Sequence, residues 1–401
     1  MTGEFQSDFP SSREAALSRL DEFLSVAGAY ASKRNHVVPG HPHVSRLSPA
    51  TRTRLLLETE VCEVVRDRFP ASQVEKFEQE VWWRLYWKGW LEQRPGTWDR
   101  YRRELAELSW EERAMQVAAG ESGVAIMDYF AKELVETGYL HNHARMWWAA
   151  FWIHVEKLPW QLGADFFLRH LIDGDAASNT LSWRWVAGLH TKGKSYLVRR
   201  SNLEKYVAPE LLAAHSEGLS RLESPRAVEL PFEEPPAIGA IADATLPDPL
   251  PERYGLWVHD EDLLLEESPL ASTAPHSVAA FVPLDLWRRE NYSEGKCRFL
   301  SSALEDGLRR AEKHFSTASV FERSDVWIES LLDWAESSNL DAVVAMRPTV
   351  GPLADHWSEV EKVLADSGRH LVGVRRSSDA AAFPKATAGF FGFWKKTASF
   401  R

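Results

Sequence analysis

The chain has 401 residues, of which 44% are hydrophobic and 26% are charged, and its formal net charge is −11. This composition is ordinary for a folded chain and excludes a mainly disordered one. The negative charge also excludes a protein that coats nucleic acid over its whole surface, so any DNA binding needs a local basic face.

The N-terminal segment and the hydropathy pattern predict a cytoplasmic protein. Two acids precede the first base, and no apolar core of a signal peptide follows. No run of about 18 uncharged apolar residues occurs that would cross a membrane. The two cysteines, Cys62 and Cys297, are too few for a disulfide scaffold or an iron–sulfur cluster, so we expect neither.

Apolar residues at i, i+3 and i+4 predict helices through the first half of the chain. Pro49 suits the first turn of its helix, and Ser48 before it is a plausible N-cap. Alternating strand patterns are absent here, so residues 1–221 are predicted to form an all-helical domain. The predicted helices cover residues 12–33, 49–69, 72–93, 122–138, 142–158 and 161–172.

The second half of the chain has a different hydropathy pattern. Residues 222–251 are rich in proline and acid, which indicates an extended, semi-rigid linker. From residue 252 to 401, short β-branched runs alternate with helical segments, which predicts a Rossmann-like, mostly parallel α/β domain. The expected strands are 254–259, 277–283, 318–323, 341–348 and 370–376, and the expected helices are 296–315, 324–338 and 353–368.

The chain contains 18 tryptophans, many of them clustered in residues 82–90, 145–152 and 182–185. Large helical cores would account for them, because buried aromatic rings carry much apolar area. A stacking platform for bases or a flat cofactor, or an electron-transfer chain, would account for them equally well.

Two polar segments stand beside these aromatic clusters. Asp173 and Asp175 form either a surface turn with a helix cap or a pair of carboxylates aimed at a ligand with donors. Their segment lacks the glycine and terminal glutamate of a calcium loop, so we expect no metal. In residues 138–146, Asn142 capping a helix is the simpler interpretation. The two histidines beside it are spaced i, i+2, which argues against a zinc site on one helix face.

Two further segments suit phosphate groups. Residues 45–49 place two hydroxyls and an arginine before a helix start, which is either a phosphate site or an ordinary cap. Residues 189–200 are either a solvated loop or a strip that contacts a phosphate backbone. The basic residues of that strip are Lys192, Lys194, Arg199 and Arg200.

Several motifs in a fixed order resemble the FAD-binding domain of the photolyase/cryptochrome family. They are YASKRN, SRLSP, EVWWRLYWKGWLE, GYLHNHARM, LPW, LIDGDAASNTLSWRW and KGKSYLVRRSN, and the resemblance covers residues 20–210. The α/β half is similar to the family's antenna-type domain, which precedes the FAD domain there and follows it here, as in a circular permutation. The resemblance implies bound FAD and an antenna chromophore of unknown identity.

The resemblance implies a set of FAD contacts. Residues 45–48 match the segment that holds the phosphates, although Val44 stands where the family often has a hydroxyl residue. Arg145 and Asp173 match the pair that brackets the isoalloxazine ring, and Asn179 matches the residue facing its N5 atom. The full set is Tyr30, Ser45, Arg46, Leu47, Ser48, Arg84, Asn142, Arg145, Asp173, Asp175 and Asn179.

The resemblance also implies contacts to a flipped pyrimidine dimer. Glu80 would steady the charge that develops on the dimer. Met146 matches the cyclobutane-dimer class, whereas His143 stands where many such enzymes have arginine. The full set is Glu80, Trp83, Asn142, His143, Met146 and Trp185, with Lys194 and Arg199 on flanking phosphates.

An electron wire completes the implied machinery. Trp183 and Trp160 match its two inner members, and the outer position falls on Glu107, close to Trp110. The implied catalytic residues are therefore Glu80, Asn142, Met146, Asn179, Trp183, Trp160 and Trp110.

The resemblance implies a monomeric deoxyribodipyrimidine photo-lyase. Excited, reduced FAD would pass an electron to a cyclobutane pyrimidine dimer in damaged DNA. The alternatives are a cryptochrome-like blue-light receptor without repair activity, and a redox or purely structural flavoprotein.

Overall fold

The computed structural model describes residues 9–190 and 195–401. Helices fill the first half, as predicted, and no strand of the sheet lies among the described residues before Tyr254. These helices are α1 (Arg13–Ala27), α2 (Tyr30–Lys33), α3 (Ser48–Arg52), α4 (Glu58–Arg68), α5 (Ala71–Glu92), α6 (Gly96–Ala106), α7 (Glu112–Ala118), α8 (Ala125–Thr137), α9 (Asn142–Ala150), a π-helix (Phe151–Val155), α10 (Trp160–His170), α11 (Ala176–Val186), α12 (Arg200–Tyr206) and α13 (Pro209–Ala214).

Two of the predicted helices are interrupted. Residues 12–33 form α1 and α2, and tertiary contacts account for the break in the second helix. Residues 49–69 form α3 and α4 with a break between them, and Arg54 in the break has a left-handed φ of 55°. Its guanidinium forms buried ion pairs with Asp262, at 3.0 Å, and Asp379, at 2.8 Å. Both partners lie in the other half of the chain, so local periodicity gave no sign of the break.

Both predicted side-chain caps are wrong. Helix α3 begins at Ser48 itself, and its N-cap, Leu47, makes no side-chain capping bond. Helix α9 begins at Asn142, and the capping side chain is that of His141, which accepts a hydrogen bond from the His143 N–H. An imidazole nitrogen can serve as the acceptor here because a neutral histidine has one lone pair available.

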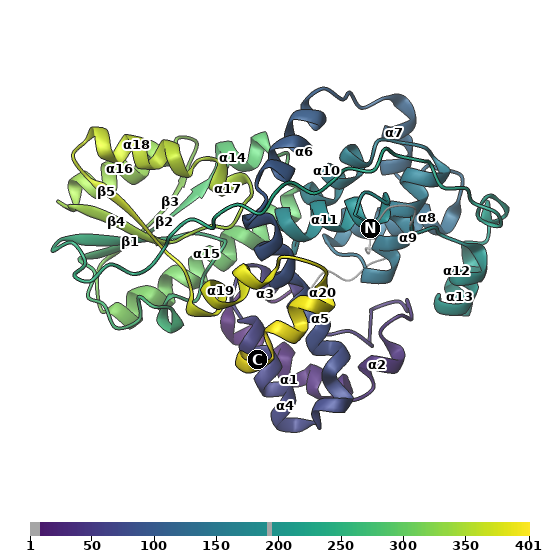
Figure 1. The fold of residues 1–401 in the computed structure, drawn as a ribbon, viewed down its shortest axis with the longest axis horizontal. Coiled ribbons are helices and arrows are strands. Elements are labelled where there is room, and N and C mark those ends of the chain that lie inside the picture. Colours follow the sequence, from purple (N-terminus) through teal and green to yellow (C-terminus); the bar gives the residue numbers. More distant parts are fainter. Residues whose placement is uncertain (1–8, 191–194) are drawn as a thin grey trace.

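The second half contains a five-stranded sheet that confirms the predicted parallel α/β fold. The strand order is β3-β2-β1-β4-β5, and every pairing is parallel. Helix α15 (Glu294–Phe315) covers one face, and α16 (Trp327–Ser337) and α18 (Trp357–Asp366) cover the other (Figure 1). The strands are β1 (Tyr254–Val258), β2 (Ser277–Pro283), β3 (Ser319–Ser324), β4 (Ala342–Met346) and β5 (His370–Val374), and the remaining helices are α14 (Leu284–Arg289), α17 (Pro352–Asp355), α19 (Ser377–Ala382) and α20 (Phe390–Lys396).

The predicted linker crosses the surface of the helical half before it enters the sheet (Figure 1). Residues 225–247 contain neither helix nor strand. The segment is nevertheless anchored: the Gly239 N–H donates to the Gln93 carbonyl at 2.8 Å, and Glu233 pairs with Arg100 at 3.0 Å and Arg184 at 2.7 Å. The linker is therefore extended, as predicted, and docked along its length.

The two hydrophobic cores do not follow the division into residues 1–221 and 252–401. Leu20 of α1 and Leu56, in the break between α3 and α4, are among the residues of the N-terminal segment that join the core around the sheet. In the opposite direction, the C-terminal segment from Phe383 onward packs into the core of the helical half. A Cβ atom at Gly89 of α5 would lie 2.7 Å from the Phe383 Cα, so this close approach needs glycine.

Candidate functional site

Two arginine–aspartate pairs join three segments of the helical half. Arg84 of α5 pairs with Asp175, and Arg145 of α9 pairs with Asp173 at 2.9 Å. Each carboxylate is only 4% exposed, so the interpretation of residues 171–175 as a surface turn is wrong. Asp175 also caps α11 by accepting from the Ser178 N–H at 2.8 Å, so one carboxylate serves as a helix cap and as a site residue.

The Asp173 carboxylate is buried and ionised. Burial by itself raises the pKa of this carboxyl group, but the charges of Arg145 and Arg84 outweigh burial and leave the pKa below its ordinary value. The Asp173 Oδ1 atom is buried and has no hydrogen-bond partner. A buried acceptor of this kind is costly unless a donor satisfies it.

The segment of residues 45–48 lies against the same cluster. Arg84 donates to the Ser48 carbonyl at 3.5 Å, and the Ser45 hydroxyl accepts from the Leu47 N–H at 3.4 Å. The Arg46 guanidinium lies 4.7 Å from the centre of the Phe9 ring, and its backbone is left-handed with a φ of 55°. The structure therefore brings the predicted phosphate segment to the paired carboxylates.

Asn179 and Trp183 lie one turn apart on α11. The Asn179 side-chain amide donates to the Ala164 carbonyl of α10 at 2.7 Å, which orients the group toward that helix. The Trp183 ring lies edge-on to Phe167 with 5.0 Å between ring centroids. Both side chains are therefore fixed by α10 before any ligand binds.

The histidines at the start of α9 are kept neutral. Burial, His41 and the charge of Arg145 lower the pKa of His141 well below its ordinary value. Burial also lowers the pKa of His143, whose Nδ1–H donates to the Asn35 carbonyl at 2.8 Å. Asn142 between them is exposed, and Met146 is partly buried one turn later.

Sequence reasoning missed Arg34 as a partner of the predicted substrate residue Glu80. Arg34 forms an ion pair with Glu80 and also hydrogen-bonds the Tyr30 hydroxyl. The basic residue inside the YASKRN motif was the available signal, because a carboxylate aimed at a substrate needs a nearby cation to hold it in place.

Trp83 and Trp185, which are predicted to form the apolar walls around the substrate, each contact another aromatic ring. Trp83 stacks on Phe390 of α20, with 4.0 Å between ring centroids and 10° between planes. Trp185 is 41% exposed and lies 5.6 Å from the Tyr196 ring. Arg199 is exposed at the N-cap of α12, whereas Lys194 lies outside the described residues.

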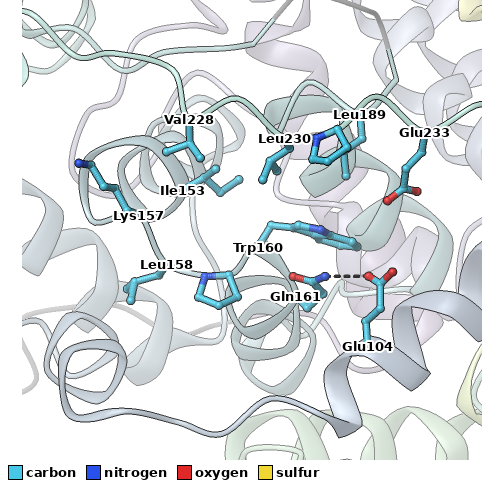
Figure 2. A pocket seen from close by; sticks show the side chains of 12 residues that line it. Glu104, Ile153, Lys157, Leu158, Trp160, Gln161, Leu189, Val228, Leu230 and Glu233 are labelled. Carbon is cyan, nitrogen blue, oxygen red and sulfur yellow. Dashed lines mark hydrogen bonds between the residues drawn. The ribbon is translucent and has the colours of Figure 1, made fainter.

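Trp160 and Trp110, two predicted members of the electron wire, contact different aromatic residues. Trp160 stacks on Tyr101 at 5.4 Å and forms one wall of a cavity of about 380 Å³ (Figure 2). Trp110 instead lies 5.9 Å from Trp152. Within the described part of the chain, no direct ring contact joins Trp110 to Trp160, and the wire through Trp183 and Trp160 stays a prediction.

The cavity beside Trp160 lies between the π-helix and the docked linker. Ile153, Leu189 and Leu230 give it largely apolar walls, and Gln161 donates to Glu104 at 2.7 Å along one edge (Figure 2). Among residues 9–190 and 195–401, no cluster of three or more His, Cys, Asp or Glu side chains is arranged to hold a metal ion. No helix in these ranges is long and apolar enough to cross a membrane.

Parts of the chain are similar in sequence to known proteins. Residues 77–208 match the family model of the FAD binding domain of DNA photolyase. The deoxyribodipyrimidine photo-lyase of Synechococcus sp. is 29% identical over 228 residues, which are 51% of this chain and 47% of that protein. The corresponding enzyme of Streptomyces griseus is 33% identical over 37% of this chain and 32% of its own length. The chain thus spans about a third to a half of the curated relatives that it matches.

Two solved structures are similar to parts of the chain. A cryptochrome from Synechocystis sp. PCC6803 is 20% identical with a TM-score of 0.46, covering 55% of this chain and 48% of that chain. A bacterial class III photolyase from Agrobacterium tumefaciens is 26% identical with a TM-score of 0.43, covering 49% of this chain and 42% of that chain.

Residues 77–208, in the helical half that holds the paired arginines and carboxylates, are similar to the FAD-binding domain of DNA photolyase. This similarity supports a photolyase/cryptochrome-type flavoprotein with FAD as its cofactor. The residues present fit that cofactor, because the isoalloxazine ring offers an N–H donor of the kind that the buried Asp173 Oδ1 lacks. Arg84 and Arg145 supply the positive charge that a pyrophosphate and an electron-rich ring need.

Proposed function

We propose that this protein is a light-driven DNA repair enzyme that splits cyclobutane pyrimidine dimers. The arrangement of α5 supports the proposal. Glu80 and Arg84 are spaced i, i+4, so they share one helix face, and Trp83 lies between them. Arg84 reaches the carboxylates of the flavin site, and Glu80 is one turn away. Helix α5 therefore carries Arg84, which can bind FAD, beside Glu80 and Trp83, which can bind a damaged base pair.

The residues of this face would bind and orient the dimer. When bound and reduced, FAD supplies the light-driven electron that opens the cyclobutane ring. The dimer has to leave the base stack to reach the site, because its reacting bonds are inaccessible in a duplex. Trp83 and Trp185 would form apolar walls. Glu80 would face the dimer carbonyls, and the Arg34 guanidinium that pairs with Glu80 would supply hydrogen-bond donors beside it.

The test is repair of an oligonucleotide that contains one cyclobutane dimer, under blue light and in darkness. We expect intact pyrimidines to appear only in the light. Glu80→Ala should lower the repair yield while FAD stays bound, and Glu75→Ala, at an exposed position of α5, serves as the matched control. A protein whose flavin responds to light but which repairs no dimer would instead be a blue-light receptor.

We further propose that Lys194 and Arg199 contact phosphates that flank the dimer. Arg199 is exposed and follows Tyr196 by three residues, and the Tyr196 ring lies 5.6 Å from that of Trp185, which supports this placement. Each lost phosphate contact should reduce the slope of log K against log salt by about 0.7 to 0.9. A salt titration of Lys194→Ala and Arg199→Ala on the same oligonucleotide tests it, and slopes equal to wild type would contradict it.

We assign FAD binding and repair to residues 1–221 and an antenna chromophore to residues 252–401. A parallel sheet covered on both faces supports this division, because such sheets commonly bind ligands at the carboxyl ends of their strands. An absorption band of the purified protein beyond those of FAD would reveal the second chromophore. We also propose that the protein acts as a monomer in the cytoplasm. Light scattering of the purified protein after size-exclusion chromatography tests its oligomeric state.

A further inference from the structure

The chain ends in a basic segment, although the molecule as a whole has a net charge of −11. Residues 385–401 contain no Asp or Glu, and their basic residues are Lys385, Lys395, Lys396 and Arg401. Helix α20 lies in this segment and packs beside α5 (Figure 1). We propose that the outer face of α20 binds DNA, with Phe391 stacking on a base beside the flipped dimer and Lys395 and Lys396 contacting phosphates. The inference rests on the proposed function and adds a DNA contact from the C-terminal end of the chain.

The inner face of α20 is fixed on the part of α5 that carries the predicted substrate wall. Phe390 is buried and stacks on Trp83, with 4.0 Å between ring centroids and 10° between planes. Just before the helix, the Ala388 carbonyl accepts a hydrogen bond from the Tyr86 hydroxyl of α5 at 2.7 Å. Trp83 itself remains partly exposed. The outer face of α20 therefore begins beside the place where the dimer would bind.

The outer face of α20 presents one aromatic ring and two ammonium groups to solvent. Phe391 is 63% exposed, and its ring lies 5.6 Å from that of Phe390. Phe391 and Lys395 are spaced i, i+4, so they share one side of the helix. Lys395 and Lys396 are both exposed, and the Lys396 ammonium donates to the Thr387 hydroxyl at 3.2 Å. Within the ranges that the structure describes, neither lysine pairs with a carboxylate, so both charges are available to a ligand.

A DNA strand matches both kinds of group on this face. Phosphates attract lysines that have no internal partner, and the flat faces of bases stack on aromatic side chains. When a dimer leaves the duplex, the bases on either side lose a stacking neighbour, and DNA-bending proteins insert apolar side chains at such steps. Phe391 follows the residue that stacks on Trp83, so it is placed where this gap would form. In a chain with a net charge of −11, the two lysines also steer the strand toward this side of α5.

The lysines are tested by the salt dependence of DNA binding. The full-length protein is titrated with a labelled oligonucleotide duplex that contains one cyclobutane dimer, and with an undamaged duplex of the same sequence. The double variant Lys395→Ala/Lys396→Ala should reduce the slope of log K against log salt by about 1.4 to 1.8 on both duplexes, because each lost phosphate contact removes about 0.7 to 0.9. Lys313→Ala, at an exposed position of α15 in the α/β half, is the matched control and should keep the wild-type slope.

The aromatic ring is tested by the preference for damaged DNA. Phe391→Ala should weaken binding of the damaged duplex about tenfold, because a stacked base is lost, and should leave the salt slope unchanged. Binding of the undamaged duplex should change little, because no base has left its stack there. Phe391→Tyr keeps an aromatic ring and should bind as wild type does. Circular dichroism equal to wild type is the control for folding.

Three outcomes would overturn the proposal. They are a wild-type salt slope in the double lysine variant, an unchanged preference for the damaged duplex in Phe391→Ala, and binding of wild-type protein to vesicles of phosphatidylcholine and phosphatidylserine but to neither duplex. The last result would make the outer face of α20 a membrane contact. Wild-type protein that binds the damaged duplex through Phe391, Lys395 and Lys396 but repairs no dimer in the light would refute the repair function and leave this surface intact.

Discussion

Single buried charges in this site are stable only while their partners stay in place. Asp173 has a salt bridge to Arg145 at 2.9 Å and one oxygen without a partner. A buried pair of this kind costs much desolvation energy, and removing one member leaves the other charge uncompensated. At the scale of the residue, this cluster is therefore sensitive to changes that preserve its shape but remove its charge.

Asp173→Asn should destabilise the FAD-free protein by no more than about 3 kcal/mol at pH 7, because the partly buried Arg145 then loses its counterion. The native pKa of Asp173 lies below its ordinary value of about 3.9, so its stabilisation is fully present above that pH and is lost as the pH falls through the native pKa. Urea unfolding of both proteins at pH 7 and near pH 3.5 measures this. A difference that does not shrink at acid pH would contradict the assignment.

Contacts between elements bury charges that no single helix can satisfy. Lys296 of α15 is completely buried, and its ammonium donates to the Leu168 carbonyl of α10 at 2.6 Å and lies 3.8 Å from the Tyr292 ring. Burial is the main cause that lowers the pKa of Lys296 to about 7. The contact between α10 and α15 is therefore sensitive to pH.

The titration of Lys296 predicts that stability rises with pH above neutrality. Between about pH 7 and 10.4 the unfolded chain holds the Lys296 proton and the folded chain does not, so unfolding becomes harder as the pH increases. Lys296→Met should remove this contribution, which has a slope of at most about 1.4 kcal/mol per pH unit. Urea unfolding of both proteins at pH 7, 8 and 9 measures the slope. Parallel curves would show that Lys296 is not neutral in the native state.

The C-terminal segment is an integral part of the helical core. Phe383 is completely buried against α5, and Phe393 and Trp394 of α20 lie against Trp82. Phe391 on the same helix points outward and is 63% exposed. This contrast allows the packing of the segment to be tested within one short stretch of chain.

Phe383→Ala should lower the free energy of unfolding by about 3 to 5 kcal/mol, as expected for loss of a buried aromatic side chain. Phe391→Ala, the matched control, should change it by no more than about 0.5 kcal/mol because the side chain is exposed. Denaturant titrations followed by circular dichroism provide both values. Equal effects of the two changes would mean that this segment is not packed as described.

Over the whole molecule, the two cores interlock. Helices α1 to α4 share a core with the sheet, although they stand at the opposite end of the chain. The residues after Phe383 return to the helical half. Buried ion pairs between Arg52 and Asp260, at 2.6 Å, and between Arg54 and Asp262, at 3.0 Å, add polar links across the same boundary.

The interlocked cores predict that a fragment of residues 1–225 does not fold by itself. Helices α1 to α4 would lose the residues with which they share a core in the α/β half, and α5 would lose Phe383 and α20. The full chain should unfold in one cooperative transition, seen at the same midpoint by circular dichroism and tryptophan fluorescence. A soluble 1–225 fragment with a cooperative transition would contradict this prediction.

Local patterns in the sequence were enough to establish the elements and their class. Each of the five expected strands is present, because β-branched runs between helical segments report burial in a covered sheet. The motif around Asp173 and Asp175 predicted a flavin site, and the structure brings both carboxylates into one buried cluster with Arg84 and Arg145. These features depend on spacing within a single element or turn, which the sequence records directly.

Tertiary structure alone decided how the elements meet. No spacing rule links Trp110 to Trp152, Arg34 to Glu80, or Phe383 to Gly89, since each pair joins different elements. Periodicity shows which face of a helix is apolar, but the partner of that face depends on how all elements pack together to bury their surface. Packing around Gly163, for example, brings Trp152 beside Trp183, which no spacing in the sequence indicated.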